Sequence, residues 1–213
     1  MARTTPSRFP DRVTRDRPAL DALLDGTVLG HVGLVVDDAP VVIPTGIARD
    51  GDRVLLHGST GSGWMRRVAA GAPICLEVTA LDAVVVARTG FESSFRYRSA
   101  LLFGSCTPLD GDDKEAGLAR ITDRLIPGRA AEVRASSRKE LAATLLLALP
   151  IEEWTLKASQ NWPDDLAEDV AGDAWAGIVP VREVYGPVLP APDLRDGIPV
   201  PASVTGLVEH GRG

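Results

Sequence analysis

The segment ARDGDRVLLHGSTGSGWMRR, residues 48–67, contains a turn, an apolar run, a polar loop and the start of a helix. Asp50-Gly51 is typical of a hairpin turn. The run from Arg53 to Gly58 has the valine and leucine content of a strand. The glycine- and hydroxyl-rich loop that follows leads into the helix. Free backbone amides and the helix dipole favour negative charge at such a place, so the pattern indicates an anion site.

Short apolar runs continue on both sides of this segment. Six of them are TVLGHVGLVV (27–36), PVVIPTGIA (40–48), RVLLHG (53–58), PICLEVT (73–79), AVVVART (83–89) and RSALLFGSC (98–106). TALDAV (79–84) has the pattern of a second tight connection. Two later runs, IEEWTLKAS (151–159) and AWAGIVPVREVYG (174–186), predict further strands. Short strands joined mostly by turns favour an antiparallel sheet or barrel.

Helical patterns occur at four places. They are RPALDALLDG (17–26), SGWMRRVAAG (62–71), DDKEAGLARITDRLIPG (112–128) and SSRKELAATLLLALP (136–150). The last begins with a serine cap and ends at Pro150. Many strands with helices inserted late predict an α+β protein built around a β-barrel.

The chain of 213 residues is long enough for one large domain with a full core. We expect an N-terminal arm at 1–17, the main domain at 18–186 and an extended proline-rich tail at 187–213. No run reaches the length of a membrane span, and no secretory signal is visible at the start. We therefore expect a cytoplasmic protein without membrane contact.

Charge and the metal-binding residue types exclude several functions. The net charge of −6 argues against a nucleic-acid surface. Cys75 and Cys106 lie in apolar runs, which predicts reduced core thiols. His31, His57 and His210 have no zinc-ligand spacing, so no metal site is predicted.

The loop after the strand fails the two best-known nucleotide motifs. Gly58 and Gly63 have the spacing of a P-loop, but Trp64 and Met65 stand where lysine and a hydroxyl residue are required. A dinucleotide fingerprint would need a third glycine where Arg66 stands. Two interpretations remain: a phosphate site, or a serine-capped helix with arginines on its solvent face.

Four blocks together resemble a known family. They are RVLLHGSTGSGW (53–64), VAAGAPICLEV (68–78), FESSFRYRSALLFG (91–104) and WAGIVPV (175–181). They are similar, in order and spacing from about residue 20 to 185, to the pyridoxamine 5′-phosphate oxidase-like FMN-binding proteins. Within them, the branch that includes the nitroimidazole-resistance (Nim-related) flavoproteins is the most similar. The resemblance implies a six-stranded antiparallel split β-barrel with flanking helices, and a homodimer with FMN between the subunits.

The resemblance also implies a cofactor site. The backbone of Arg53 to Leu56 would run beside the flavin ring, and the loop from His57 to Trp64 would enclose the phosphate. Arg98 would reach that phosphate, and Trp175 would lie near the cofactor of the neighbouring subunit or serve as a core or interface aromatic. The implied cofactor-binding residues are Val54, Leu55, Leu56, His57, Gly58, Ser59, Ser62, Gly63, Trp64, Arg66, Arg98 and Trp175.

Two departures from the family pattern bear on function. Gly63 and Trp64 stand where the family usually has basic residues, which leaves Arg66, Arg67 and Arg98 as substitutes. The block that begins at Phe91 lacks the histidines of the Nim-related proteins. His57 is the one candidate for catalysis, as a group that orients the flavin or donates a proton; a histidine making one loop hydrogen bond is the alternative.

These patterns predict an FMN-dependent oxidoreductase that acts on a small molecule, with the chemistry carried by the cofactor. Two alternatives remain open. One is a split-barrel protein that binds a deazaflavin or heme. The other is a flavin-binding protein without catalysis.

Overall fold

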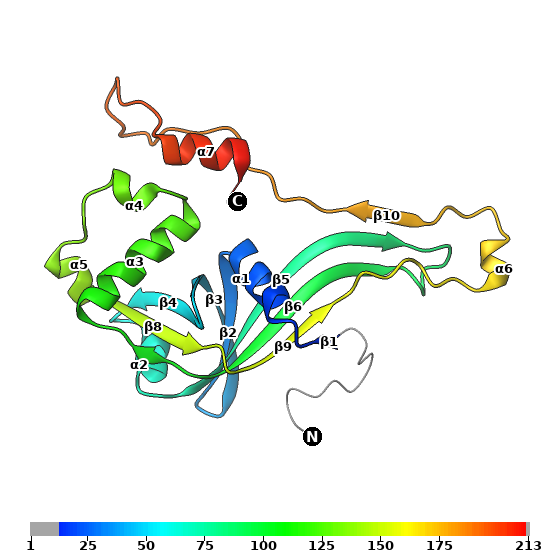
Figure 1. Ribbon diagram of the computed structural model, residues 1–213, viewed down its shortest axis with the longest axis horizontal. Coiled ribbons are helices and arrows are strands. Elements are labelled where there is room, and N and C mark those ends of the chain that lie inside the picture. The colour runs from blue at the N-terminus through cyan, green and yellow to red at the C-terminus, as the bar shows by residue number, and fades with distance from the viewer. Residues whose placement is uncertain (1–12, 212–213) are drawn as a thin grey trace.

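The chain folds around an antiparallel sheet that curls into a barrel and sends a long arm to one side (Figure 1). The computed structural model describes residues 13–211. Its strands are β1 (Val13–Thr14), β2 (Leu29–Val36), β3 (Ala39–Asp50), β4 (Arg53–Ser59), β5 (Pro73–Val86), β6 (Ser94–Ser105), β7 (Thr107–Pro108), β8 (Thr144–Pro150), β9 (Glu153–Ala158) and β10 (Gly177–Pro180). Its helices are α1 (Arg17–Gly26), α2 (Gly63–Ala69), α3 (Gly111–Leu125), α4 (Arg129–Glu132), α5 (Arg138–Ala143), α6 (Ala167–Val170) and α7 (Ala202–His210).

The strand order is β1-β9-β6-β5-β2-β3-β4-β8-β7, and β10 pairs with the outer half of β5. Each of the recorded pairings is antiparallel. β3 divides between two partners: its residues 39–46 pair with β2, and its residues 47–50 pair with β4. The predicted class, an antiparallel split barrel in an α+β chain, is confirmed.

The core has an inner and an outer part, separated by β4. Val54 and Leu56 belong to the inner cluster, to which α1 contributes Leu20, Leu23 and Leu24. Leu55 belongs to a smaller outer cluster. The other buried members of the outer cluster are Ala48, Ile121, Leu146 and Ala148. Because side chains alternate along a strand, β4 supplies both clusters and is covered on both faces.

Two predicted boundaries were wrong. The expected turn at 79–84 does not form, because β5 runs from Pro73 to Val86 and absorbs Asp82 as an irregularity in its register with β6. The expected helix 136–150 ends early. Its capping box at Ser137 and Glu140 is present, but residues 144–150 form β8 between β4 and β7. This apolar run is buried on both faces, so pairing in the sheet prevails over helical propensity.

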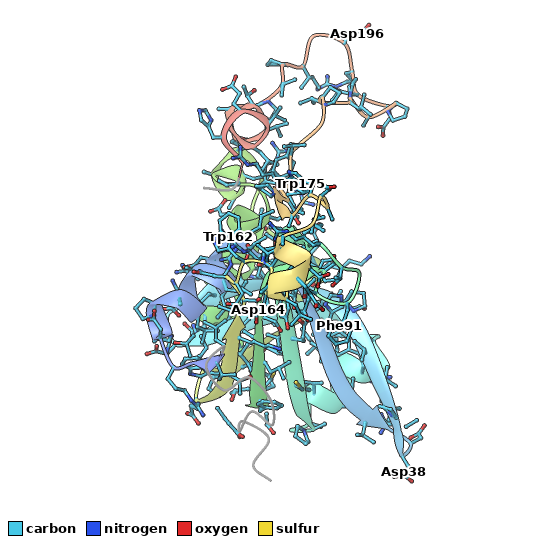
Figure 2. All side chains as sticks on the ribbon, turned by 90° about the vertical axis from the view of Figure 1, so that its right-hand side faces the viewer. Asp38, Phe91, Trp162, Asp164, Trp175 and Asp196 are labelled. Atoms are coloured by element: carbon cyan, nitrogen blue, oxygen red, sulfur yellow. The ribbon has the colours of Figure 1, made fainter. Side chains whose placement is uncertain are left out.

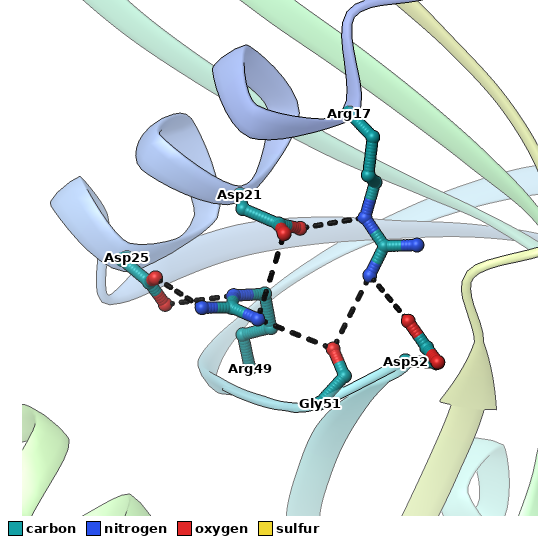
Figure 3. Close-up of polar contacts among 6 residues, drawn as sticks. All are labelled: Arg17, Asp21, Asp25, Arg49, Gly51 and Asp52. Carbon is teal, nitrogen blue, oxygen red and sulfur yellow. Dashed lines mark hydrogen bonds and ion pairs between the residues drawn. The ribbon is translucent and has the colours of Figure 1, made fainter.

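An ion-pair network joins α1 to the β3–β4 turn (Figure 3). Arg49 donates to both carboxylate oxygens of Asp25, and Arg17 bonds Asp21 at 2.7 Å. Arg17 also pairs with Asp52 at 2.8 Å. At the centre of the turn Gly51 has a φ of +61°, as expected for a glycine in a hairpin turn. These contacts fix the helix that closes the inner cluster against the hairpin that leads into β4.

The arm consists of residues 82–96 together with residues 159–180. It extends β5 and β6 away from the barrel and carries α6 and β10 (Figure 1). Phe91, Trp162 and Trp175 lie near its end (Figure 2), and Phe91 and Trp175 are 93% and 67% exposed. Asp165 is the buried polar anchor of the arm: its side chain is 1% exposed and pairs with Arg88 at 3.0 Å.

The C-terminal tail differs from the expectation of an extended segment over 187–213. Residues 202–210 form α7, whose Ser203 amide donates to Glu132 of α4 at 3.0 Å. In the described part of this tail, the proline-rich residues 187–201 lack helix and strand. The expected N-terminal arm falls mostly on residues 1–12, outside the described residues, and within 13–17 the chain already forms β1.

Both cysteines are free, as predicted; Cys106 is buried and Cys75 is half-buried. Burial raises the pKa of the Cys106 thiol to about 12, so that group stays protonated. Among residues 13–211, no helix has the length and apolar character needed to cross a membrane. The same residues contain no cluster of three or more histidine, cysteine or acidic side chains placed to hold a metal ion.

Candidate functional site

The point where β3 leaves β4 is the centre of the candidate site. The last β3–β4 pair is Ile47 with Leu56, and the next residue of β3, Gly46, pairs with Leu29 of β2 instead. His57 therefore follows the last paired position of β4 on that side, while Leu146 of β8 still pairs with it on the other. The structure thus places an imidazole at an opening in the sheet.

One ring nitrogen of His57 has no hydrogen-bond partner. Its Nδ1 is buried without a hydrogen bond. Burial lowers the pKa of His57, so the neutral ring is favoured at neutral pH. A Cβ added to Gly46 would stand 3.6 Å from Cε1 of His57, so this glycine leaves the ring without a side chain beside it. The site thus contains a neutral imidazole with one buried ring nitrogen that no protein group uses.

The loop after His57 is tied together by its own residues. Ser59 Oγ accepts a hydrogen bond from the Gly61 amide at 3.1 Å. Arg66 Nη1 donates to the carbonyl oxygens of Thr60 and Gly61, each at 3.1 Å. Ser62 occupies the N-cap position of α2, but its side chain caps no amide. The predicted serine cap of this helix is therefore absent. Arg66 instead holds the loop through its two hydrogen bonds to backbone carbonyl oxygens.

Two neighbouring positions of the loop differ in the space around them. Gly58 packs against Met65, and a Cβ there would stand 3.0 Å from the methionine side chain. Gly63 has nothing within 4 Å of such an added atom. Trp64 is partly buried against the inner cluster. A larger residue therefore has open space at Gly63, whereas at Gly58 it would require the Met65 side chain to shift.

The resemblance implies that the backbone of Val54, Leu55 and Leu56 runs beside a flavin ring. All three side chains are fully buried. Their backbone is paired with β3 on one side and β8 on the other. A contact between this segment and a flavin ring stays a prediction.

Arg98 lies in a groove of about 660 Å³ beside the α1–β2 connection. Its guanidinium forms a two-pronged pair with Asp82, with Nη2 to Oδ1 at 2.8 Å and Nε to Oδ2 at 3.1 Å. That hydrogen bond, opposed by burial, raises the pKa of Arg98. The other residues lining the groove are Gly26, Thr27, Val28, Leu29, Thr79, Ala80, Leu81, Val181 and Glu183.

The structure does not bring all predicted site residues together. Trp175 lies at the end of the arm (Figure 2), whereas α2 and the loop before it lie beside β8 in the barrel (Figure 1). No contact recorded within residues 13–211 joins Arg98 to that loop. Sequence reasoning missed Gly46 and Asp82. The available signal for Gly46 was a glycine inside a strand, which often marks a close approach of another group.

The chain belongs to the family whose model is described as pyridoxamine 5′-phosphate oxidase, which matches residues 16–158. No curated protein matches it. Among solved structures, the FAD and heme binding protein from Mycobacterium smegmatis is 54% identical, with a TM-score of 0.90. That match covers 92% of this chain and 97% of the other.

The flavocytochrome Anf3 from Azotobacter vinelandii is 33% identical over 96% of each chain, with a TM-score of 0.88. A putative 5-nitroimidazole antibiotic resistance protein from Bacteroides thetaiotaomicron is 16% identical, covering 68% of this chain and 85% of its own, with a TM-score of 0.58. The last likeness shows the fold alone. The chain is therefore a member of the flavin-binding split-barrel family.

Proposed function

We propose that this protein is a redox protein that binds a flavin and a heme and acts on a small molecule. The observation that carries the proposal is the 54% identity, over nearly the whole of both chains, to the M. smegmatis protein that is described as binding FAD and heme. The similarity to the flavocytochrome points the same way. A flavin supplies two-electron chemistry and a heme supplies one-electron chemistry, while the protein binds and orients both.

The flavin in this proposal is FAD rather than the FMN implied by the sequence resemblance. The support is the FAD named for the M. smegmatis protein. The groove beside Arg98 has the volume of a small-molecule site. Asp82 already matches the charge of Arg98, and Glu183 adds negative charge to the groove. The groove therefore suits the neutral ring of a flavin better than its phosphate.

The phosphate assignment to the loop 57–64 stays a prediction. Its test compares the affinities of FAD, FMN and riboflavin, each measured by fluorescence quenching. Binding of riboflavin as tight as that of FMN would rule out a phosphate site. Replacing Gly63 by Arg restores the basic residue of the family pattern at a position with open space. Tighter FMN binding by this variant would support the assignment.

We also propose a homodimer with the cofactors between the subunits. The support is the arm, whose end exposes Phe91, Trp162 and Trp175. Large apolar side chains gathered on one surface mark an interaction site. In addition, no recorded contact joins Arg98 to the loop 57–64 within residues 13–211 of one chain. A site that uses both would therefore draw them from two subunits. Light scattering at micromolar concentration should give twice the chain mass; a monomer with bound flavin would overturn the dimer.

The decisive experiment is the absorption spectrum of the purified protein, as isolated and after incubation with FAD and hemin. We expect flavin bands together with a Soret band. Flavin bands without heme would leave a flavoprotein, and the fluorescence of a deazaflavin would support that alternative cofactor. Reduction of the bound flavin by NADH or NADPH would separate an oxidoreductase from a flavin-binding protein without turnover.

A further inference from the structure

We propose that a pocket at the end of the arm binds the adenosine moiety of FAD. The inference rests on the proposed function, because it assigns one part of the proposed flavin cofactor to a surface outside the groove beside Arg98. The pocket has a volume of about 330 Å³ and is formed by the end of β5, the connection to β6 and the segment 159–164. Figure 2 shows three of its residues, Phe91, Trp162 and Asp164, at the end of the arm.

Aromatic side chains form the apolar part of this pocket. Phe91, Phe95 and Trp162 line it, and they are 93%, 55% and 69% exposed. A nucleobase stacks on aromatic rings of this kind, which removes both surfaces from water. The Arg96 guanidinium lies 5.1 Å from the centre of the Trp162 ring but does not line the pocket, so a base can stack there without displacing it. In the proposed dimer, where the cofactors lie between the subunits, the stacked base would cover these rings.

The polar side chains of the pocket are hydrogen-bond acceptors that suit a nucleoside. Glu92 and Asp164 line it, and no hydrogen bond or ion pair is recorded for either carboxylate within residues 13–211. The ribose hydroxyl groups and the exocyclic amine of adenine are donors that carboxylates accept. Asn161 also lines the pocket, and an asparagine side chain can bond N6 and N7 of adenine together.

Charge and size separate the adenosine moiety from the rest of the cofactor. Among the described residues that line the pocket, none is basic. The carboxylates of Glu92 and Asp164 repel anions, so the pyrophosphate of FAD must lie outside the pocket. The groove beside Arg98 is larger, at about 660 Å³ against 330 Å³. The groove therefore suits the three-ring flavin, and the pocket suits the two-ring adenine.

The two cavities lie along the same strand. Arg98 of β6 lines the groove, and Ser94, four residues earlier on β6, lines the pocket. Four residues of a strand span about 13 Å, which the ribityl, pyrophosphate and ribose units of FAD can bridge. Asp165, next to the pocket, pairs with Arg88 at 3.0 Å and thereby ties the segment that carries Trp162 to the end of β5. One chain thus places an aromatic pocket at the reach of a dinucleotide from the groove.

The experiment measures the affinity of flavin-free, full-length protein for FAD and for FMN by fluorescence quenching. Trp162→Ala is the test variant, and Trp162→Phe keeps an aromatic ring for stacking. Leu166→Ala is the matched control, because it removes an exposed apolar side chain of the arm that does not line the pocket. Titration with adenosine, followed by calorimetry, gives a readout that does not depend on the flavin. Light scattering checks the assembly of each variant.

We expect Trp162→Ala to weaken FAD binding by about fivefold or more, and FMN binding by less than about twofold, because only FAD carries a base to stack on the ring. Adenosine binding should be lost in the same variant. Trp162→Phe and Leu166→Ala should bind FAD nearly as the wild type does.

Three outcomes would count against the assignment. If Trp162→Ala changes the affinities for FAD and FMN by the same factor, or changes neither, the assignment is overturned and the proposed flavin function stands. If wild-type protein binds FAD no more tightly than FMN, the assignment and the preference for FAD fail together. If wild-type protein binds no flavin, the proposed function fails and adenosine decides the pocket: loss of its binding in Trp162→Ala would support the assignment, and equal or absent binding would overturn it.

Discussion

The barrel and the arm share the strands β5 and β6 but differ in the size of the apolar side chains that they bury. In the barrel the fully buried residues are large, such as Leu76 on β5 and Leu102 on β6, and they join one cluster with α1. In the arm the buried residues of β5 are Ala83 and Val85, while Phe95 of β6 is exposed. The barrel covers its own apolar surface, whereas the arm leaves its large apolar side chains for another surface.

This difference assigns stability and interaction to separate parts of the chain. The inner cluster removes large side chains from water, which is the main favourable term in folding. The arm is held by the pairing of β5 with β6 and β10, and its segment 159–176 is tied to β5 by the pair of Arg88 with Asp165. Changes in the barrel should therefore alter global stability, and changes in the arm should alter local order and assembly.

The largest effect is expected in the barrel. Leu76→Ala removes a fully buried side chain and should lower the free energy of unfolding by about 2–5 kcal/mol. Leu166→Ala, at an exposed site in the arm, should stay within about 0.5 kcal/mol of wild type. Denaturant titration measures both. Equal losses in the two variants would contradict the contrast between the regions.

The next effect concerns the anchor of the arm. Asp165→Asn removes the buried charge that pairs with Arg88, whose Nε is already buried without a partner. Docking of residues 159–176 should weaken by about 1–3 kcal/mol, while global stability changes little. Hydrogen exchange of this segment is the measurement, with Asp164→Asn, an exposed neighbour, as the control. Unchanged exchange in Asp165→Asn would show that the pair does not hold the arm.

A smaller effect is expected where barrel and arm meet. Arg98→Ala removes the cation that Asp82 holds in the groove, and FAD affinity should fall by roughly tenfold, about 1.4 kcal/mol. Arg96→Ala is the control, because Arg96 lies two residues away and stacks on Trp162 instead. Fluorescence titration decides the comparison. The same affinity in both variants would remove Arg98 from the flavin site.

The smallest effect is the pH dependence due to His57. Its pKa in the folded protein lies below the unfolded value of about 6.5, so the unfolded chain takes up a proton first as pH falls. Cofactor-free protein should therefore lose stability from about pH 6.5 downward until the folded pKa is reached. His57→Gln should reduce that slope. An identical slope in the variant would show that His57 is not the group responsible.

Local chemistry determined much of this fold from the sequence alone. The turn at Gly51 and the strands on both sides of it follow from residues that are neighbours in the chain. The helix 17–26 was predicted with its observed bounds for the same reason. The family was also readable, because its motifs lie within short segments such as 53–64.

Tertiary structure alone decided the features that depend on distant partners. Residues 144–150 became β8 because β4 and β7 offered pairing on both edges, which no local pattern of that apolar run reveals. Arg98 pairs with Asp82, which lies at a register irregularity in β5 where the sequence had predicted a turn. His57, with a buried Nδ1 that has no hydrogen-bond partner, lies where β3 leaves β4 at Gly46. Periodicity reports which residues are apolar along the chain, whereas pairing between strands far apart in sequence sets which polar groups are left without partners.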